Sequence, residues 1–301
     1  MKNVRKAILI AVVALFSIEV YAQQQEVLTF TRIERSPRAA ALAGAGAASV
    51  GSAAYASFTN SAIIPFYDGK GDFAAGWEYW APALGAANAM SAAGAYNFGP
   101  VGVSLGGVYQ MEQPYGDGFK PSEFQVNLGV GVKVLPWLGF GLNARYAQET
   151  IFQGYSNKGF GMDVMALFAP VKGLTVVAGA ANIGTKVQDS AGNGFPQPMS
   201  ILAAAAYNLE IGTRNFLEFM LDENYYLASG TNAVSFGMEY SFDHIAFARI
   251  GYRIASNNAA YPSHLSFGLG AQFKGFRIDV SYLTLSEVIG NTVAIGLGYR
   301  F

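Results

Sequence analysis

Apolar residues alternate with small or polar residues along the chain from Gly71 to its end. In the stretch 124–134 the apolar positions are Phe124, Val126, Leu128, Val130, Val132 and Val134, and the residues between them are small or polar. A period of two is typical of a β-strand whose two faces have different surroundings. A soluble sandwich alternates in the same way, but its strands are typically about five or six residues long. The segments here run to about ten to twelve residues, the length that crosses a bilayer on a tilt. The pattern therefore predicts transmembrane strands, with lipid on one side and an enclosed lumen on the other.

Fourteen such segments can be counted. They are expected at 71–81, 88–98, 100–111, 122–134, 137–149, 158–169, 172–183, 198–209, 213–225, 230–242, 243–254, 263–273, 275–285 and 291–301. Short connections (98–100, 135–137, 243–244, 274–276) alternate with longer ones (111–121, 150–157, 184–197, 255–262). Outer-membrane barrels combine short periplasmic turns with longer external loops. We therefore predict an all-β fold: a 14-stranded antiparallel transmembrane β-barrel over 71–301, with both barrel ends in the periplasm. The alternation is weakest over 172–183 and 243–254, and it slips near Arg249, which suggests a bulge.

Composition agrees with a membrane protein. Hydrophobic residues make up 52% and charged residues 13% of the 301 residues, against about a quarter charged in soluble proteins. Residues 1–22 are typical of a signal peptide, with Lys2 and Arg5 before an apolar run and a small-residue cleavage site at Val20-Tyr21-Ala22. A membrane anchor is the alternative, but the apolar run is short. After it no apolar run is long enough for a spanning helix, and a closed barrel is the remaining way to satisfy a backbone in lipid.

Charge and cysteine content exclude several classes of function. Without the signal peptide the chain carries 16 basic and 19 acidic residues, which argues against nucleic acid as a partner. The chain has no cysteine, so it has neither a disulfide framework nor a thiolate metal site. Its two histidines, His244 and His264, are far apart in the sequence, and we expect no metal site and no cofactor.

Residues 23–70 do not alternate, and we interpret them as an N-terminal hatch or plug segment. Ser36 is expected to cap a short helix with Pro37 in its first turn and Arg38 following, and Gly44 and Gly46 are expected to end it. A fourteen-strand barrel is wider than one whose own side chains fill the interior. A run of small residues at 45–56 suits packing against a glycine- and alanine-rich wall. The alternative is a disordered periplasmic tail.

Charged residues on the strands are predicted to face the lumen. Alternation points Glu78, Lys133, Arg145, Asp163, Glu218, Asp222, Glu239, Arg277, Asp279 and Arg300 inward. Strand direction puts Lys133, Glu239, Arg277, Asp279 and Arg300 toward the periplasmic end, and we hypothesise that they hold the hatch. In this hypothesis Arg277 and Arg300 contact its backbone carbonyls or Glu34. A solvated, self-paired lumen is the alternative.

Two patterns that could carry catalysis are weak. Gly102-Val103-Ser104-Leu105-Gly106 fits a nucleophile elbow, but that motif needs a turn between strand and helix. His264 and Ser266 share one face of a strand as in outer-membrane phospholipases, yet alternation points both into the lumen. We therefore predict no catalytic residue.

The end of the chain and its beginning resemble known signals. Val293, Ile295, Leu297, Tyr299 and Phe301 share one face, and the terminal aromatics Tyr299 and Phe301 resemble the signal that outer-membrane assembly machinery reads. Glu26 to Phe30, followed by Ser36-Pro37-Arg38 and the alanines to Ala45, resembles the N-terminal signature of the PorV/PorQ family, which is related to FadL-type fatty-acid transporters. That family usually shows Asn-Pro-Ala farther on, where this chain has Asn60-Ser61-Ala62 with the proline at Pro65.

The resemblance implies a fourteen-strand outer-membrane barrel with a hatch, in some members linked to type IX secretion. Our first functional hypothesis is a non-enzymatic scaffold or adaptor for secretion or surface attachment. Its partners would be outer-membrane lipid, proteins of a secretion or assembly complex, and the outer-membrane assembly machinery. The alternative is a FadL-like channel for hydrophobic small molecules. The lumen face of Gly, Ala, Ser, Asn and charge favours the adaptor over a channel with an apolar interior.

Overall fold

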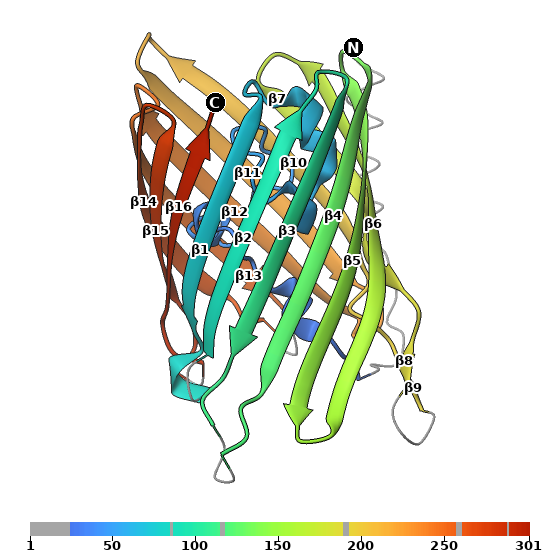
Figure 1. Cartoon of the computed structure of the whole chain (residues 1–301). Helices are drawn as coiled ribbons and strands as arrows, with labels where there is room; N and C mark the ends of the chain where they lie inside the picture. The colour runs from blue at the N-terminus through green and yellow to red at the C-terminus, as the bar shows by residue number, and fades with distance from the viewer. Residues whose placement is uncertain (1–24, 85–86, 115–117, 189–192, 257–260, 288) are drawn as a thin grey trace.

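The strands form one closed barrel in the computed structural model, which describes residues 25–84, 87–114, 118–188, 193–256, 261–287 and 289–301 (Figure 1). The signal peptide predicted at 1–22 lies outside these residues. The fourteen wall strands are β1 (Gly71–Trp80), β2 (Ala87–Asn97), β3 (Val101–Met111), β4 (Ser122–Leu135), β5 (Leu138–Phe152), β6 (Tyr155–Val171), β7 (Leu174–Gly184), β10 (Ser200–Ile211), β11 (Asn215–Tyr226), β12 (Thr231–Phe242), β13 (Ala246–Ala255), β14 (His264–Phe273), β15 (Phe276–Thr284) and β16 (Thr292–Arg300). Each overlaps one of the fourteen predicted segments, and the predicted fold class is confirmed.

Every wall strand pairs antiparallel with its neighbours, and the barrel closes where β1 meets β16. In that seam Asp72 lies opposite Arg300, and Tyr79 lies opposite Val293. The backbone continues the pairing past the strands, because Phe301 O accepts hydrogen bonds from the N–H groups of Lys70 (2.8 Å) and Gly71 (3.0 Å). Both ends of the wall therefore lie at the same end of the barrel, as an even number of strands requires.

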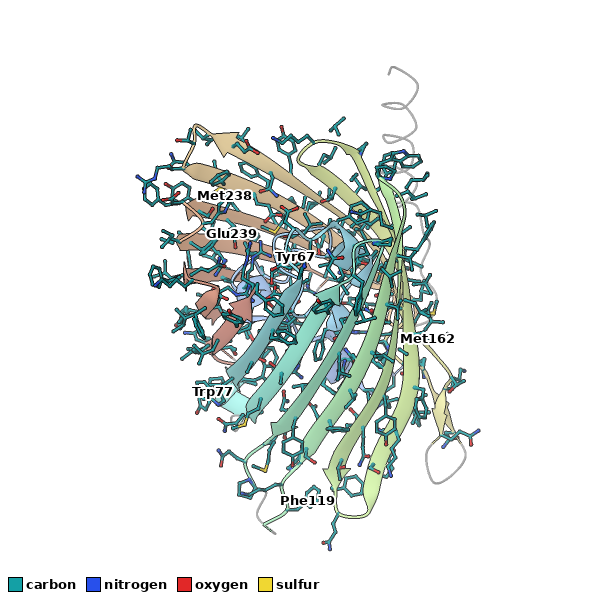
Figure 2. The ribbon with its side chains drawn as sticks, turned by 45° about the horizontal axis from the view of Figure 1, so that its top comes forward. Tyr67, Trp77, Phe119, Met162, Met238 and Glu239 are labelled. Carbon is teal, nitrogen blue, oxygen red and sulfur yellow. The ribbon has the colours of Figure 1, made fainter. Side chains whose placement is uncertain are left out.

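The two faces of the wall differ as the alternation predicts. Val130, Leu142 and Phe267 are exposed on the outside, at 39%, 48% and 41% of their surface. Met238 points outward on β12, whereas the next residue, Glu239, is buried inside (Figure 2). A barrel whose outer surface is a continuous apolar band is suited to lipid rather than to water. No helix in the described parts of the chain is long and apolar enough to span a membrane.

Connections are short at the end that holds the C-terminus, and most are longer at the other end (Figure 1). The connection 185–199 contains a two-stranded ribbon, β8 (Val187–Gln188) and β9 (Gly194–Phe195), and the one after β1 contains the 3₁₀-helix η4 (Pro82–Leu84). The predicted loop at 150–157 is wrong. Strands β5 and β6 continue through it, with Phe152 paired to Tyr155 and Gly154 at positive φ in the tight turn.

The two weakest predicted strands differ from each other. Strand β13 pairs with β12 without a register shift, and Glu239 lies opposite Arg249, so the bulge suggested near Arg249 is wrong. Strand β7 is irregular instead, because its register with β6 shifts between Met162 and Val164. At this point Asn182 has φ 57° and donates its N–H to Asp163 Oδ1 at 2.7 Å. The hydrogen bond from Asn182 N–H to the Asp163 side chain thus replaces one backbone hydrogen bond between β6 and β7.

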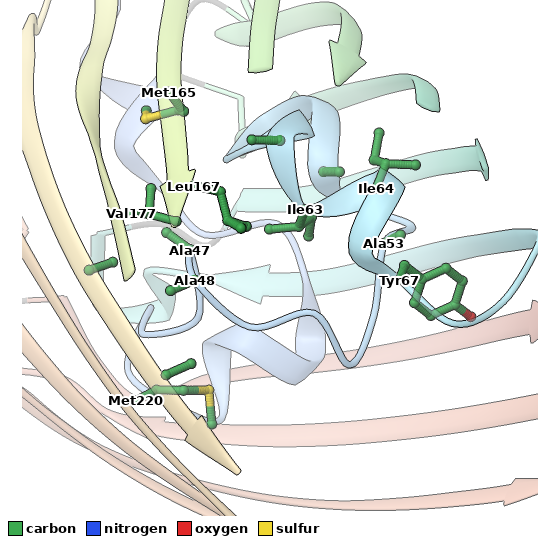
Figure 3. Packing of buried hydrophobic residues seen from close by; sticks show 14 of the residues in the cluster. Ala47, Ala48, Ala53, Ile63, Ile64, Tyr67, Met165, Leu167, Val177 and Met220 are labelled. Atoms are coloured by element: carbon green, nitrogen blue, oxygen red, sulfur yellow. The ribbon is translucent and has the colours of Figure 1, made fainter. Parts of the chain in front are cut away.

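The described residues before β1 lie inside the barrel (Figure 1). This N-terminal segment, residues 25–70, contains the 3₁₀-helices η1 (Thr29–Arg32), η2 (Ala56–Phe58) and η3 (Ser61–Phe66) and the helical turn α2 (Pro37–Ala40). Its apolar side chains and those of the wall form the main buried cluster, in which Ile63 lies beside Leu167 (Figure 3). The interior is therefore a packed core shared by the segment and the wall.

Candidate functional site

The N-terminal segment runs along the barrel from one end to the other, and it makes different contacts on the way. Near its start Val27 N–H donates to Pro196 O at 3.1 Å, beside the long connection 185–199. Near its end Phe66 lies under the Nζ of Lys133 at 4.3 Å, close to the start of β1. Between these points the segment crosses the lumen.

The helical turn α2 is formed as the sequence predicts at its start. Ser36 Oγ accepts the N–H of Ala39 at 3.3 Å, and Pro37 occupies the first turn. The turn ends earlier than predicted, at Ala40, and the chain then passes through Ala43 at φ 57° and Gly44 at φ 84°. This left-handed bend favours glycine at position 44. Gly46 then presents its N–H to the wall.

Arg38 projects from α2 into a row of charged side chains that alternate in sign around the wall. In order the members of this charged row are Asp72, Arg277, Asp279, Arg249, Glu239, Arg38 and Glu218. Arg38 is 2.8 Å from both Glu218 Oε2 and Glu239 Oε2, and Arg249 is 2.6 Å from Asp279. All seven are largely buried, so removing one partner leaves an uncompensated charge at a cost of about 3–5 kcal/mol.

Two wall carboxylates accept backbone N–H groups of the segment. Asp222 Oδ2 accepts from Gly46 at 3.1 Å and from Ala47 at 2.8 Å. Asp72 Oδ2 accepts from Ala53 at 2.8 Å, from Ala54 at 3.2 Å and from the hydroxyl of Ser52 at 2.8 Å. Hydrogen bonds to an ionised acceptor are stronger than neutral ones, so these carboxylates fix the irregular backbone between α2 and η2.

The opposite part of the wall is uncharged where it approaches Ser61 and Ala62 at the start of η3. Asn60 caps η3 through its side chain, which accepts the N–H of Ala62 and donates to Ala47 O, both at 2.9 Å. Pro65 lies inside η3. A Cβ on Gly131 would lie 2.0 Å from Ser61 O, and one on Gly141 would lie 2.3 Å from Ala62 N. Glycine at these two wall positions is therefore required by the close approach of the segment's backbone.

The charges predicted to hold the hatch all face inward, but the proposed contacts of Arg277 and Arg300 are wrong. Arg277 forms ion pairs with Asp72 at 3.4 Å and Asp279 at 3.0 Å instead of contacting carbonyls or Glu34. The guanidinium of Arg300 lies over the ring of Tyr67, 5.7 Å from its centre. Glu239 contacts the segment through Arg38, and Lys133 and Arg300 face the rings of Phe66 and Tyr67. The hydrogen bonds and ion pairs to the segment come mainly from wall carboxylates, which receive Arg38 and backbone N–H groups.

Sequence reasoning missed several members of the site. Arg249 and Arg253 are buried in the lumen, and strict alternation over 246–255 would have found both had no bulge been assumed. Arg35 of the segment pairs with Glu78 at 3.2 Å and donates to Gln110 at 3.0 Å. Arg145 pairs with Asp163, and both had been placed inward. Nothing in the local sequence signals that Arg35 and Glu78 meet, since they are joined only by the tertiary fold.

The residues weighed for catalysis are used in structural contacts. Ser104 lies within β3 and shares a hydrogen bond with Ser61 (2.9 Å), so it is not at an elbow. Ser266 donates to Ala41 O at 2.9 Å, and His264 Nδ1 is 3.0 Å from Pro262 O. No group of three or more potential metal ligands occurs among the described residues.

The terminal aromatics lie on the outer face, as predicted. Phe301 stacks on Phe73 with ring centres 6.1 Å apart, and Tyr299 contacts Phe276 at 4.8 Å. They flank the seam between β1 and β16. Recognition of Tyr299 and Phe301 by the outer-membrane assembly machinery stays a prediction.

One carboxyl of the segment has a shifted acidity. Burial raises the pKa of Glu34 above the ordinary glutamate value, against the opposing effect of the N–H groups of Ser36 and Arg35 and the charges of Arg35 and Arg253. Ser36 N–H donates to Glu34 Oε1 at 2.7 Å. Glu34 is therefore easier to protonate while the segment is in place.

Comparison with known proteins identifies the fold. No family model and no curated protein matches the sequence. Among solved structures, the monoaromatic hydrocarbon channel CymD superposes with a TM-score of 0.65 at 12% identity, over 92% of this chain and 98% of that one. The Pseudomonas putida toluene transporter TodX has a TM-score of 0.65 at 12% identity, over 93% and 99%. A Pseudomonas aeruginosa FadL homologue gives 0.60 at 10%, over 89% and 99%. The names of these neighbours describe a hydrocarbon channel, a toluene transporter and a FadL homologue, and the resemblance to the PorV/PorQ family is not confirmed.

Proposed function

We propose that this chain is an outer-membrane channel for a small hydrophobic molecule, and that the N-terminal segment is its hatch. The proposal reverses the order of the two hypotheses drawn from the sequence. Its first support is the fold, because the channels and transporters CymD and TodX superpose over almost their whole length. Its second support is the apolar outer surface, which suits a bilayer.

The observation that carries the proposal is how the segment is attached. Apart from Lys70 at its end, it fills the lumen without pairing into the sheet, and it contacts the wall through side chains and separate N–H groups such as those of Gly46 and Ala47. Contacts of this kind can be exchanged for water or for a ligand without breaking the barrel. A filler joined in this way can shift while the wall stays closed, which is what a hatch requires.

A disulfide that locks the segment to the wall tests the proposal. Ser61 Oγ on η3 and Ser104 Oγ on β3 are 2.9 Å apart, and the chain has no cysteine of its own. The double variant Ser61→Cys/Ser104→Cys can therefore be oxidised without competing thiols. Uptake of a radiolabelled monoaromatic hydrocarbon is measured in intact Gram-negative cells that express it.

A channel with a mobile hatch gives uptake in the reduced variant and a several-fold loss on oxidation, restored by reductant. The single variant Ser104→Cys is the control and stays insensitive to oxidant. Uptake no greater than in cells without the protein refutes the channel. A large, steady conductance of the locked protein in planar bilayers refutes the hatch.

The adaptor remains a second candidate because the lumen is filled and charged rather than an apolar tunnel. Co-purification from native membranes in mild detergent tests it. A stable set of partner proteins, retained by the locked variant, favours the adaptor. Recovery of the barrel alone argues against it.

A further inference from the structure

A cavity of about 150 Å³ lies inside the barrel between the N-terminal segment and the wall. Residues 31–39 and 44–47 of the segment line one side of it, and side chains from β5, β6, β7, β10, β11 and β13 line the other. Drug-sized ligands occupy cavities of about 300–1,000 Å³. This one has room for a single ring with one or two substituents.

Positive charge predominates on the lining. It contains two carboxylates, Glu34 and Asp222, and five arginines, which are Arg32, Arg35, Arg38, Arg145 and Arg253. Four of the arginines have ion-pair partners, but none of the partner carboxylates lines the cavity: Glu26 belongs to the segment, and the others, such as Glu78 and Asp163, belong to the wall. These carboxylates fix the positions of the guanidinium groups, which line the same cavity. A cavity lined in this way attracts anions.

Arg253 is the exception among the five. It is only 6% exposed, and no carboxylate of the described residues lies within ion-pair distance of it. Its Nη1 donates to Ser235 Oγ at 3.3 Å, its guanidinium lies over the Tyr261 ring at 5.1 Å, and its Nε has no partner among the described residues. A buried guanidinium normally has a carboxylate or phosphate partner, often in a two-point contact.

We infer that this cavity binds a small aromatic carboxylate, with its carboxylate on Arg253. The aromatic part follows from the lining, where Tyr55, Phe58, Tyr226 and Tyr261 stand among the arginines. A plain hydrocarbon of the same size would leave the guanidinium without a partner, which disfavours it. The inference rests on the proposed function, because it names the class of molecule that the channel would hold in its lumen.

Asp222 adds a second element of selectivity. Its Oδ2 is occupied by the N–H groups of Gly46 and Ala47, but its Oδ1 has no partner in the described residues, and the residue is only 3% exposed. A hydroxyl group on the ligand ring would donate to this oxygen. The preferred ligand is therefore a hydroxylated aromatic acid, and 4-hydroxybenzoate is the probe of choice.

Calorimetric titration of the purified full chain in detergent tests the inference. The probes are 4-hydroxybenzoate, benzoate and the uncharged 4-hydroxybenzyl alcohol. The variant is Arg253→Met, which keeps the apolar stem and removes the charge. The matched control is Arg214→Met, at an exposed arginine paired with Asp243 on a turn. Resistance to unfolding in detergent confirms that each variant forms a barrel.

Binding of 4-hydroxybenzoate at least tenfold tighter than that of the alcohol supports the inference, as does a tenfold or greater loss in Arg253→Met with none in Arg214→Met. Equal affinity for acid and alcohol, or no binding at millimolar concentration, overturns it. If Arg253→Met does not fold, the comparison of acid with alcohol in the unaltered chain decides. Hydrocarbon uptake without acid binding supports the channel and refutes this inference. Acid binding without uptake of either the hydrocarbon or 4-hydroxybenzoate supports the binding site and refutes the channel.

Discussion

The two sides of the barrel hold the same segment by opposite means. On the side of β3, β4 and β5 the wall residues next to Ser61 and Ala62 are uncharged, and glycines such as Gly131 and Gly141 let the backbone of η3 come within contact distance. On the side of β11, β12, β13 and β15 the charged row receives Arg38 between Glu218 and Glu239. The wall thus holds the segment by close packing on one side and by ion pairs on the other.

The difference teaches which contacts can be released. Close packing of η3 against glycine is a matter of volume, and nothing can replace it except another group of the same shape. Ion pairs and N–H contacts can be exchanged for water or for a ligand of suitable charge. We therefore expect residues 32–47 to leave the wall before η3 does, and the Ser61–Ser104 lock to block the second of these movements.

The largest expected effect comes from breaking the charged row at its centre. Glu239→Gln leaves Arg38 and Arg249 facing a neutral amide in a buried site, and we expect a loss of about 3–5 kcal/mol in the free energy of unfolding. Urea titration in detergent, followed by tryptophan fluorescence, measures it. Asp243→Asn is the control, since the Asp243–Arg214 pair is exposed and worth less than about 1 kcal/mol. Equal losses in both variants would show that the row is not the stabilising element.

Filling the neutral side should cost somewhat less. In Gly141→Val the new side chain meets the backbone of Ala62, and forced overpacking typically costs about 1–3 kcal/mol. Ala144→Val on the same strand faces lipid and should be nearly neutral. Protease cleavage within residues 50–66 should rise in Gly141→Val alone. If both variants resist cleavage equally, the close approach of η3 is not what keeps it in place.

The N–H contacts of Asp222 should have a smaller effect. Asp222→Asn keeps one acceptor oxygen but loses the charge, and hydrogen bonds to charged groups contribute about 1.5–3 kcal/mol. We expect a loss near the lower value, with faster hydrogen exchange at the amides of Gly46 and Ala47. Glu210→Gln, at an exposed ion pair with Lys172, is the control and should not alter that exchange. Unchanged exchange in Asp222→Asn would contradict this role.

The smallest effect concerns Glu34 and depends on pH. Since burial raises its pKa in the folded protein, the folded state binds this proton more tightly than the unfolded state. Its destabilising contribution is therefore absent below the unfolded pKa and grows as the pH rises through the folded one. Glu34→Gln keeps the acceptor for Ser36 N–H and should remove this dependence.

The measurement for Glu34 is the difference in unfolding free energy between the two proteins from pH 4 to pH 8. We expect Glu34→Gln to be equal in stability at the acid end and more stable at the neutral end. Arg35, Arg253, Asp222 and Glu78 act on Glu34 electrostatically, and they are present in both proteins, so they cancel to first order. A constant difference across the range would contradict the assignment.

The wall was predictable from the sequence because alternation is a local property. From Gly71 onward, the position of a residue in the alternation predicts which face of the wall it lies on. The pattern therefore places Val130 and Leu142 in lipid and Arg145 and Asp163 in the lumen. The predictions fail where pairing with the neighbouring strand, and not the local alternation of apolar and polar residues, decides the backbone conformation. The pattern predicts a loop at 150–157, but the β5–β6 hairpin extends through it, and the pattern predicts a bulge near Arg249, where β13 pairs regularly with β12.

The contacts of the site were not predictable to the same extent. The cap at Ser36 and the bend at Gly44 follow from local chemistry and were found. Which carboxylate meets Arg38 depends on how the segment lies in the barrel, and no spacing in the sequence encodes that. Glu239 is among the residues that the alternation predicts to hold the hatch, but its pairing with Arg38 and the contacts of Asp72, Glu218 and Asp222 with the segment do not follow from the sequence.

Asp72 has a consequence for the order of assembly. It lies on the first strand, it accepts N–H groups from Ala53 and Ala54, and it pairs with Arg277 on the strand next to the last. The side chain of Asp72 therefore takes part both in closing the barrel and in docking the N-terminal segment. Its partner Arg277 lies some 200 residues away in the chain. Contacts so distant in the chain form late and slowly, so we expect the interior to become ordered in the same step that joins the first and last strands.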